Sequence, residues 1–241
     1  MRRRTVALLG LLSLALTGCG GNGSPSASIP SSSPGPGART VSFDTQDGVR
    51  LTGHLYGSGT VGVVLAHMFP AEDAAASWTS TAQRLAEAGY MALAINFRGY
   101  ADSGGERDID QLHLDIEAAH DLLVERGAQQ IAYVGASMGG TVSLVTASYR
   151  DPVAVVTVSA PAQFRGLDAE AVARELTTPV LLLAAAGDAV AASSLETLAE
   201  LIPGAEAKLF GGDAHGTNLL ADAPSSEDEI LAFLEAHAPT A

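Results

Sequence analysis

The stretch from Gln130 to Gly140 constrains this chain more than any other. Ile131–Val134 has the composition of a short buried strand and runs directly into the sequence Gly-Ala-Ser-Met-Gly. An apolar segment from Thr141 to Tyr149 follows and predicts a buried helix. A serine between two glycines, where a strand meets a helix, is typical of the nucleophile elbow, a turn tight enough to strain the serine backbone. Such a turn exposes the Ser137 hydroxyl at the end of the strand and leaves the Met138 N–H beside it.

The first 19 residues have the pattern of an export signal. Three arginines at positions 2–4 precede an apolar run from Val6 to Leu16, which is too short to span a bilayer. The run ends in Leu-Thr-Gly-Cys, which resembles a bacterial lipobox. We therefore predict a lipoprotein signal peptide over residues 1–18 and a lipid anchor at Cys19, with the domain on the extracytoplasmic side of the bacterial membrane. An ordinary signal peptide or a buried segment is the alternative. Cys19 is the only cysteine, so an exported chain has no intramolecular disulfide and depends on its core.

Composition divides the rest of the chain in two. Residues 19–39 are mostly Gly, Ser, Pro and Ala, as in a disordered tether, whereas residues 40–241 are long enough for one α/β domain with a substantial core. Without residues 1–18 the chain has 10 basic and 27 acidic residues, so its net charge is −17. Nucleic acid and anionic lipid both require clustered Lys and Arg, so the domain itself is expected to bind neither.

Short apolar runs alternate with amphipathic segments from residue 41 onward. The first two, Val41–Phe43 and Val49–Tyr56, flank an Asp-Gly pair that favours a type I′ hairpin turn. Continuous apolar runs then indicate strands covered on both faces, with helices between them. The expected fold class is α/β, a doubly wound, mainly parallel sheet with antiparallel N-terminal strands and no large cap. The expected later strands are Val61–Ala66, Met91–Ile95, Ile131–Val134, Val153–Val158, Val180–Ala184 and Ala207–Phe210, and the helices are Ala74–Ala88, Asp108–Arg126, Thr141–Tyr149, Ser193–Leu201 and Glu227–Ala236, the last with a Ser226–Glu229 capping box.

A serine becomes an effective nucleophile only when a base removes its proton and an acid orients that base. With this kind of elbow the expected order along the chain is serine, acid, histidine. Asp188 follows a buried strand and so lies at the same sheet edge as Ser137, and His215 lies in a glycine-rich loop after the last strand. We predict these three as the catalytic residues. Asp213 is the alternative acid, and His237 in the terminal helix is expected to be solvated.

The loop after the third expected strand should supply a backbone N–H for the oxyanion that forms during acyl transfer. It reads His-Met-Phe-Pro from residue 67 to residue 70, with a methionine where a glycine usually follows the histidine. We predict the N–H groups of Met138 and Phe69 as the two donors, with Met68 as the second choice for the latter. His67 precedes the serine in the chain and is expected to brace the loop rather than to act as the base.

From about Arg39 to the C-terminus the chain resembles the α/β-hydrolase superfamily, and within it the small dienelactone-hydrolase-like and esterase branches. The elbow at Ser137 and the turn Asn96–Gly104 carry the resemblance, although the turn begins with asparagine where aspartate is commoner. Dienelactone hydrolases proper have a cysteine nucleophile, so their specific activity is not implied here. Only Ser159–Pro179 is available for an insertion over the site, enough for one short helix near Asp168–Leu176. An open site of this kind suits short acyl esters or the exposed ends of larger substrates.

These features together predict a serine hydrolase that cleaves carboxylic esters or thioesters through an acyl-enzyme. Its expected partners are a small-molecule ester substrate and, through the lipid on Cys19, the membrane. A peptidase or an acyltransferase on the same triad is an alternative, because the sequence does not distinguish water from other acceptors. A binding lipoprotein that kept the fold and lost the chemistry is the alternative outside the enzymes.

One further set of residues has the spacing of metal ligands. His113, Glu117 and His120 are four and three residues apart on the expected helix Asp108–Arg126. No fourth ligand accompanies them in the sequence, and a solvated helix face is the simpler interpretation. We assign neither a metal nor a cofactor to the chain.

Overall fold

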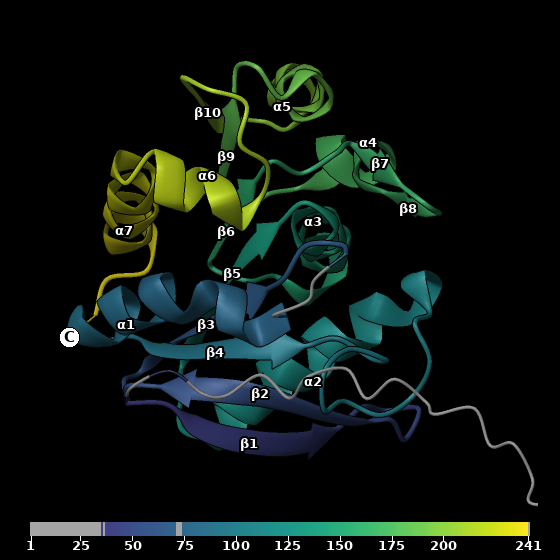
Figure 1. The fold of residues 1–241 in the computed structure, drawn as a ribbon, viewed down its shortest axis with the longest axis vertical. Helices are drawn as coiled ribbons and strands as arrows, with labels where there is room; N and C mark the ends of the chain where they lie inside the picture. The colour runs from purple at the N-terminus through teal and green to yellow at the C-terminus, as the bar shows by residue number, and fades with distance from the viewer. Residues whose placement is uncertain (1–34, 36, 71–73, 241) are drawn as a thin grey trace, which may run out of the picture.

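The computed structural model describes residues 35, 37–70 and 74–240, and Figure 1 shows one twisted sheet with helices on both of its faces. The eight strands of the sheet lie in the order β1-β2-β4-β3-β5-β6-β9-β10. β1 pairs antiparallel with β2, and β2 pairs antiparallel with β4. Every pair from β4 to β10 is parallel. This arrangement confirms the predicted fold class.

The elements lie close to the segments that the residue pattern predicts. The strands of the sheet are β1 (Arg39–Asp44), β2 (Arg50–Tyr56), β3 (Val61–Ala66), β4 (Met91–Asn96), β5 (Gln130–Ala136), β6 (Ala154–Val158), β9 (Val180–Ala185) and β10 (Glu206–Phe210), and β7 (Gln163–Phe164) and β8 (Leu167–Asp168) form a separate small hairpin. The α-helices are α1 (Thr79–Glu87), α2 (Leu112–Glu125), α3 (Met138–Arg150), α4 (Ala169–Val172), α5 (Ala189–Leu201), α6 (Thr217–Asp222) and α7 (Ser225–His237), and the 3₁₀ helices are η1 (Ala74–Trp78), η2 (Ile109–Gln111) and η3 (Ala173–Glu175).

A hydrophobic core lies on each face of the sheet. Helices α2, α3 and α5 pack over one face and α1, α6 and α7 over the other. Neighbouring strand residues point into opposite cores, as Ala132 and Tyr133 of β5 do. Because both faces are covered, β3, β4 and β6 are buried along their whole length. This explains why their sequences are continuous apolar runs rather than alternating ones.

The parallel strands bring distant parts of the sequence to one edge of the sheet. Ala66 at the end of β3 pairs with Gly135, and Ala136 at the end of β5 pairs with Val158. At the other side of β9, Phe210 at the end of β10 pairs with Ala185. The loops that follow β3, β5, β9 and β10 therefore start at the same edge, where ligands of doubly wound sheets bind.

The predicted type I′ turn between β1 and β2 is wrong. Gly48 has φ +83°, but Asp47 is not among the residues with positive φ, which a type I′ turn requires at both positions. Instead the Gly48 N–H donates to the Thr45 carbonyl, and the Thr45 N–H donates to the Val49 carbonyl, which makes a three-residue loop ending in a left-handed glycine. The Asp47 carboxylate accepts hydrogen bonds from the Arg98 guanidinium, and this long-range contact fixes the loop.

The predicted capping box at the last helix is also wrong. Helix α7 begins at Ser225, one residue after Pro224, because proline suits the start of a helix. Ser226 therefore lies inside the first turn, where its hydroxyl donates to the Ala223 carbonyl. Glu229 instead forms an ion pair with Lys208 of β10.

The sequence pattern also missed short elements around the loops. Helix α6 and the β7–β8 hairpin were not predicted, and the single helix expected over Asp168–Leu176 consists of α4 and η3. The helix expected over Ala74–Ala88 begins as η1 before α1, and α5 begins at Ala189 rather than Ser193. Short segments of this kind contain too few turns for a periodic pattern to show.

Candidate active site

Ser137 lies at the turn between β5 and α3 in a strained conformation. Its φ is +48° and its ψ is −118°, and its N–H donates to the Val158 carbonyl. The glycines on either side are required by close backbone contacts. A Cβ on Gly135 would lie 2.3 Å from the Gly139 carbonyl oxygen, and a Cβ on Gly139 would lie 2.2 Å from the Ala66 carbonyl oxygen. Residues 135–139 therefore form the strand-to-helix turn that their sequence predicts.

The structure brings the three predicted catalytic residues into one hydrogen-bonded chain. His215 Nε2 lies 2.8 Å from Ser137 Oγ, and His215 Nδ1 lies 2.5 Å from Asp188 Oδ2. Since the carboxylate can only accept, Nδ1 carries the ring proton and Nε2 is free to accept the serine O–H. Geometry of this kind is what proton transfer from a serine hydroxyl to an imidazole needs.

Asp188 is held by its own helix. It forms the N-cap of α5, and its Oδ1 accepts a hydrogen bond from the Ala191 N–H at 3.3 Å while Oδ2 faces the histidine. Asp213, the alternative acid, is exposed, and among the described residues no hydrogen bond joins it to His215. The geometry therefore favours Asp188 over Asp213 as the acid.

The loop that carries His215 is held by helix α6 and by the β3 loop. Gly216 has φ +59° and forms the N-cap of α6, and a Cβ on it would lie 2.5 Å from Met68 Sδ. The methionine that replaces the usual glycine of the β3 loop thus packs against the histidine loop. His237, expected to be solvated, packs on Phe233 at the end of α7 and is partly exposed.

The two predicted oxyanion donors lie on the loops that flank the serine. Met138 is the first residue of α3, so its N–H belongs to the first turn, where amides have no partner within the helix. Phe69 lies in the loop that follows β3, and the elbow packs against the start of that loop at Ala66 and His67. The roles of these two N–H groups stay predictions.

His67 is fully buried and braces the β3 loop. Its Nε2 accepts the Phe97 N–H at 3.2 Å, so its Nδ1 donates to the Met68 carbonyl at 2.9 Å. Its ring packs edge-on against Phe97 and Tyr100, with centroids 4.8 and 4.7 Å away. Burial lowers the pKa of His67 to about 4. The side chain is therefore neutral near pH 7, and both of its nitrogens are already occupied.

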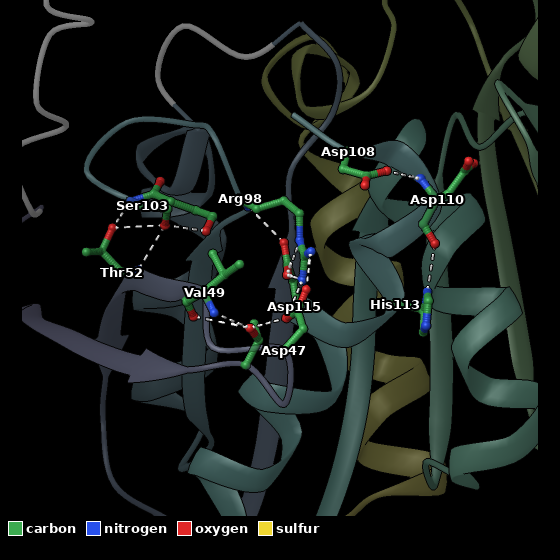
Figure 2. Close-up of polar contacts among 11 residues, drawn as sticks. Asp47, Val49, Thr52, Arg98, Ser103, Asp108, Asp110, His113 and Asp115 are labelled. Carbon is green, nitrogen blue, oxygen red and sulfur yellow. Dashed lines mark hydrogen bonds and ion pairs between the residues drawn. The ribbon is translucent and has the colours of Figure 1, made fainter. Parts of the chain in front are cut away.

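A buried ion-pair cluster, which the sequence reasoning missed, holds the turn after β4. Arg98 is 4% exposed and pairs with the fully buried Asp115 of α2 at 2.7 Å and with Asp47 of the first hairpin at 2.8 Å, as Figure 2 shows. The Arg98 N–H also donates to Asp115. The cluster fixes the backbone next to Phe97, which is the residue that donates to His67. A signal was present in the sequence, because Asp115 interrupts the apolar stripe of its helix.

Other polar contacts complete this turn. The Asn96 side chain accepts the Ala75 N–H and donates to Thr52 Oγ1. Ser103 donates to the Asn96 carbonyl and accepts the Thr52 N–H, which closes the turn onto β2 (Figure 2). Asparagine thus takes the place where aspartate is commoner by using both ends of its amide.

The three residues with metal-ligand spacing have separate partners. His113 is hydrogen-bonded to the Asp110 carbonyl, His120 to the Tyr133 hydroxyl, and Glu117 to the Tyr149 hydroxyl. In the part of the chain that the structure describes, no group of three or more His, Cys, Asp or Glu side chains could hold a metal ion. The same part contains no helix that is long and apolar enough to cross a membrane.

Comparison with known proteins gives a family match over part of the chain. Residues 63–167 match the model of a family described as "Serine aminopeptidase, S33", a stretch that includes Ser137 but neither Asp188 nor His215. No curated protein matches the chain. The match supports the α/β-hydrolase superfamily and, at a coarser level, a hydrolase; the dienelactone-hydrolase-like branch has no support beyond the sequence.

Solved structures of hydrolases share the fold at low sequence identity. An esterase of Pyrococcus furiosus is 19% identical with a TM-score of 0.70, over 83% of this chain and 91% of that one. An esterase of Exiguobacterium antarcticum is 15% identical with a TM-score of 0.67, over 81% and 99% of the two chains. A hydrolase of Pseudomonas aeruginosa is 18% identical with a TM-score of 0.70, over 81% and 98%. At these identities the likeness shows the α/β-hydrolase fold.

Proposed function

We propose that this protein is a serine hydrolase that cleaves carboxylic esters or thioesters through an acyl-enzyme. The observation that carries the proposal is the hydrogen-bonded chain from Asp188 through His215 to Ser137. The strained elbow supports it, since backbone strain at a residue with a reactive side chain is typical of catalytic sites. The esterases among the structural neighbours have the same fold.

The geometry suggests how the residues would act. Ser137 Oγ attacks the ester carbonyl carbon while His215 Nε2 takes the hydroxyl proton, and Asp188 stabilises the imidazolium that forms. The N–H groups of Met138 and Phe69 stabilise the oxyanion. Collapse of the tetrahedral intermediate breaks the bond to the alcohol, which leaves with the proton from His215. A water molecule then attacks the acyl-serine, with His215 again as base, and releases the carboxylic acid.

The small insertion between β6 and β9 supports short or exposed acyl groups as substrates. It holds only the β7–β8 hairpin, α4 and η3, which form no large apolar cap. His215 is 42% exposed, so the base is reached from solvent. A groove of about 660 Å³ between β1 and α2 has no residue of the triad in its lining and plays no part in the proposal.

Peptidase activity is the second candidate, because the matching family is described as a serine aminopeptidase. The same triad could cleave an amide, and an acyltransferase would differ only in the acceptor. Matched amino acid p-nitrophenyl esters and p-nitroanilides with a free α-amino group separate the esterase from the peptidase. Comparable kcat/KM values for ester and anilide would establish the peptidase instead.

Labelling by a fluorophosphonate probe tests the proposal itself. Wild-type protein should be labelled at Ser137, and Ser137→Ala should not be. A panel of p-nitrophenyl esters of increasing chain length should show highest kcat/KM for the short acyl groups. An unlabelled, inactive but folded wild-type protein would establish a binding lipoprotein instead.

We also propose that the enzyme is tethered by a lipid on Cys19 at the extracytoplasmic face of the membrane. Cys19 and most of the tether lie outside the described residues, whereas Arg39 at its end already belongs to β1, and the proposal depends on the lipobox pattern. Cell fractionation of wild type and Cys19→Ala, with esterase activity measured in both fractions, tests it. The wild type should fractionate with the membrane, and Cys19→Ala should release the activity or trap the precursor. A wild-type enzyme found wholly in the soluble fraction would contradict the anchor.

A further inference from the structure

The β7–β8 hairpin places an arginine at its tip in an unusual backbone conformation. Arg165 and Gly166 form the turn, with φ values of +45° and +102°. Two-residue hairpin turns with two positive φ values favour Asn, Asp or Gly at the first position, because a larger side chain is strained there. The glycine is required, since a Cβ on Gly166 would lie 2.6 Å from Asp110 Oδ1. Strained non-glycine residues concentrate at functional sites, so Arg165 invites a functional explanation.

The guanidinium group of Arg165 lies over the oxyanion loop. It stacks on the Phe69 ring at 4.3 Å from the centroid and lies 5.5 Å from the Phe164 ring. The two rings contact each other, with centroids 5.8 Å apart, so the hairpin is docked on the loop. Phe69 is also the proposed oxyanion donor. The positive charge therefore lies over the side chain of the residue whose backbone N–H would face the reacting carbonyl.

The charge of Arg165 is available to a ligand. Its side chain is exposed, and no carboxylate pairs with it in the part of the chain that the structure describes. Stacking occupies the flat face of a guanidinium and leaves the in-plane N–H groups free to bind a carboxylate with two hydrogen bonds. A second exposed arginine, Arg107, stacks in the same way on the Tyr100 ring at 4.3 Å. Tyr100 in turn packs against His67.

The neighbouring groove limits where an anion could bind. A cavity of about 380 Å³ is lined by Arg98, Arg107 and Arg165, but also by Glu106, Asp108 and Asp110. Arg98 is committed to its two aspartates, and the Asp108 carboxylate accepts the Asp110 N–H (Figure 2). The cavity as a whole is therefore not cationic. Of its two exposed arginines, Arg165 is the one that lies above Phe69, the proposed oxyanion donor.

We propose that Arg165 binds a carboxylate group of the substrate, so that the preferred substrates are esters that also carry a free carboxylate. The proposal rests on the proposed hydrolase function and adds its substrate class. The chain has a net charge of −14, so its overall field repels anions, and selection of an anionic ester needs a local cation of this kind. Because Arg165 is exposed, its contribution should weaken as ionic strength rises.

The kinetic test compares charged and neutral esters of the same shape. The first pair tests a carboxylate on the acyl group: mono(4-nitrophenyl) succinate is compared with 4-nitrophenyl 4-methylpentanoate, which replaces the carboxylate by an isopropyl group. The second pair, 4-acetoxybenzoate and its methyl ester, tests a carboxylate on the leaving group. In the wild type, at least one charged ester should have the higher kcat/KM. Arg165→Gln should lower that value about ten- to a hundredfold and leave the neutral partner within about twofold, as loss of a charge-assisted hydrogen bond implies.

Arg126→Gln is the matched control. Arg126 follows α2, four residues before β5 starts, and so lies at the edge of the sheet opposite the triad. Its replacement by glutamine changes the net charge by the same amount as Arg165→Gln. The preference for the charged ester should survive in Arg126→Gln. In the wild type the same preference should fall when the assay contains 0.5 M NaCl. If Arg165→Gln lowers kcat/KM equally for charged and neutral esters, the arginine only supports the loop and the proposal is overturned. A wild type that hydrolyses the esters but prefers the charged ester in neither pair would overturn it as well.

A binding measurement separates this proposal from the proposed function. In a Ser137→Ala background no acyl-enzyme forms, so the affinity for mono(4-nitrophenyl) succinate is measured by calorimetry without turnover. Arg165→Gln in that background should raise Kd about tenfold or more, and Arg126→Gln should not. Unchanged Kd would reject the subsite even if esters are hydrolysed. A raised Kd would support it even if the wild type hydrolysed none of the esters, a result that would count only against the proposed function.

Discussion

His67 and His215 follow parallel strands at the same edge of the sheet, and their surroundings differ in a way that separates a structural histidine from a base. Each carries its proton on Nδ1, but His67 donates it to a backbone carbonyl whereas His215 donates it to the Asp188 carboxylate. At Nε2, His67 accepts a backbone N–H that cannot be given up, whereas His215 accepts a serine hydroxyl.

The partner at each nitrogen decides what a histidine can do. A carboxylate at Nδ1 stabilises the imidazolium that forms when the base takes a proton, and a neutral carbonyl does so only weakly. Burial adds to the difference, since it lowers the pKa of His67 to about 4 and keeps that ring neutral. Position after a strand is therefore common to both histidines, and the hydrogen-bond partners distinguish them.

The largest effect should come from exchanging each histidine for glutamine. His215→Gln removes the base, and we expect kcat to fall by about 10⁶-fold, as for the base of other serine hydrolases. His67→Gln should lower it only about ten- to a hundredfold, through a displaced oxyanion loop. Turnover of 4-nitrophenyl acetate by both variants, with circular dichroism to confirm folding, checks the order. Equal losses in two folded variants would contradict the distinction.

The carboxylate at Nδ1 is tested by two aspartates. Asp188→Asn should lower kcat about 10⁴-fold, because an amide can stabilise the wrong tautomer and leaves the imidazolium without its charge partner. Asp213→Asn, two residues from the histidine but exposed, should stay within about threefold of the wild type. The opposite order in the same ester assay would make Asp213 the acid.

The sequence predicts the strands, the order of the triad and its sheet edge, because each has a local signal. The elbow glycines, the Gly-Asp pair after β9 and the glycine-rich loop of His215 are all visible in a few consecutive residues. Contacts between distant segments carry no such signal. Arg98 meets Asp115 and Asp47 across 17 and 51 positions of the chain, and this is why the hairpin turn at Asp47 was predicted wrongly.

Met68 shows the same limit at the site itself. A methionine in place of glycine reads as a loss of backbone freedom, yet in the structure its sulfur packs against Gly216 beside the base. Only the fold shows that the loops after β3 and β10 meet. Arg165 was likewise not singled out in the sequence, and its contact with Phe69 follows from a hairpin too short to be recognised there.

The support behind His67 can be tested through stability. Arg98→Met leaves the fully buried Asp115 without its partner, which should lower the free energy of unfolding by about 3–5 kcal/mol. Adding Asp115→Leu removes the stranded carboxylate and should restore most of the loss. Arg126→Met, at the exposed end of α2, is the control and should have little effect. Urea unfolding of the four proteins measures this, and an Arg98→Met protein as stable as the control would show that the cluster contributes nothing.

The smallest effect expected is the pH dependence that His67 adds to stability. Its pKa is about 4 in the folded protein against 6.5 for an unperturbed histidine, because burial disfavours the charged ring. Between these two values the unfolded chain binds a proton at this position and the folded protein does not. Stability therefore falls as pH drops through this window, by about 3 kcal/mol in total and by about 2 kcal/mol between pH 7 and pH 5.

Two carboxyl groups of the Arg98 ion-pair cluster titrate as well, so a variant must isolate the histidine. Burial raises the pKa of Asp115 to about 6 against the opposing effect of Arg98, so this group makes the protein more stable as pH falls, the opposite of His67. Hydrogen bonds from Arg98 lower the pKa of Asp47 to about 2. Both groups are present in His67→Gln, where the histidine contribution is absent. The loss in unfolding free energy between pH 7 and pH 5 should be about 2 kcal/mol greater in the wild type than in His67→Gln. Parallel pH profiles would mean that His67 is protonated as easily in the folded protein as in the unfolded chain, and its contrast with His215 would then rest on hydrogen bonding alone.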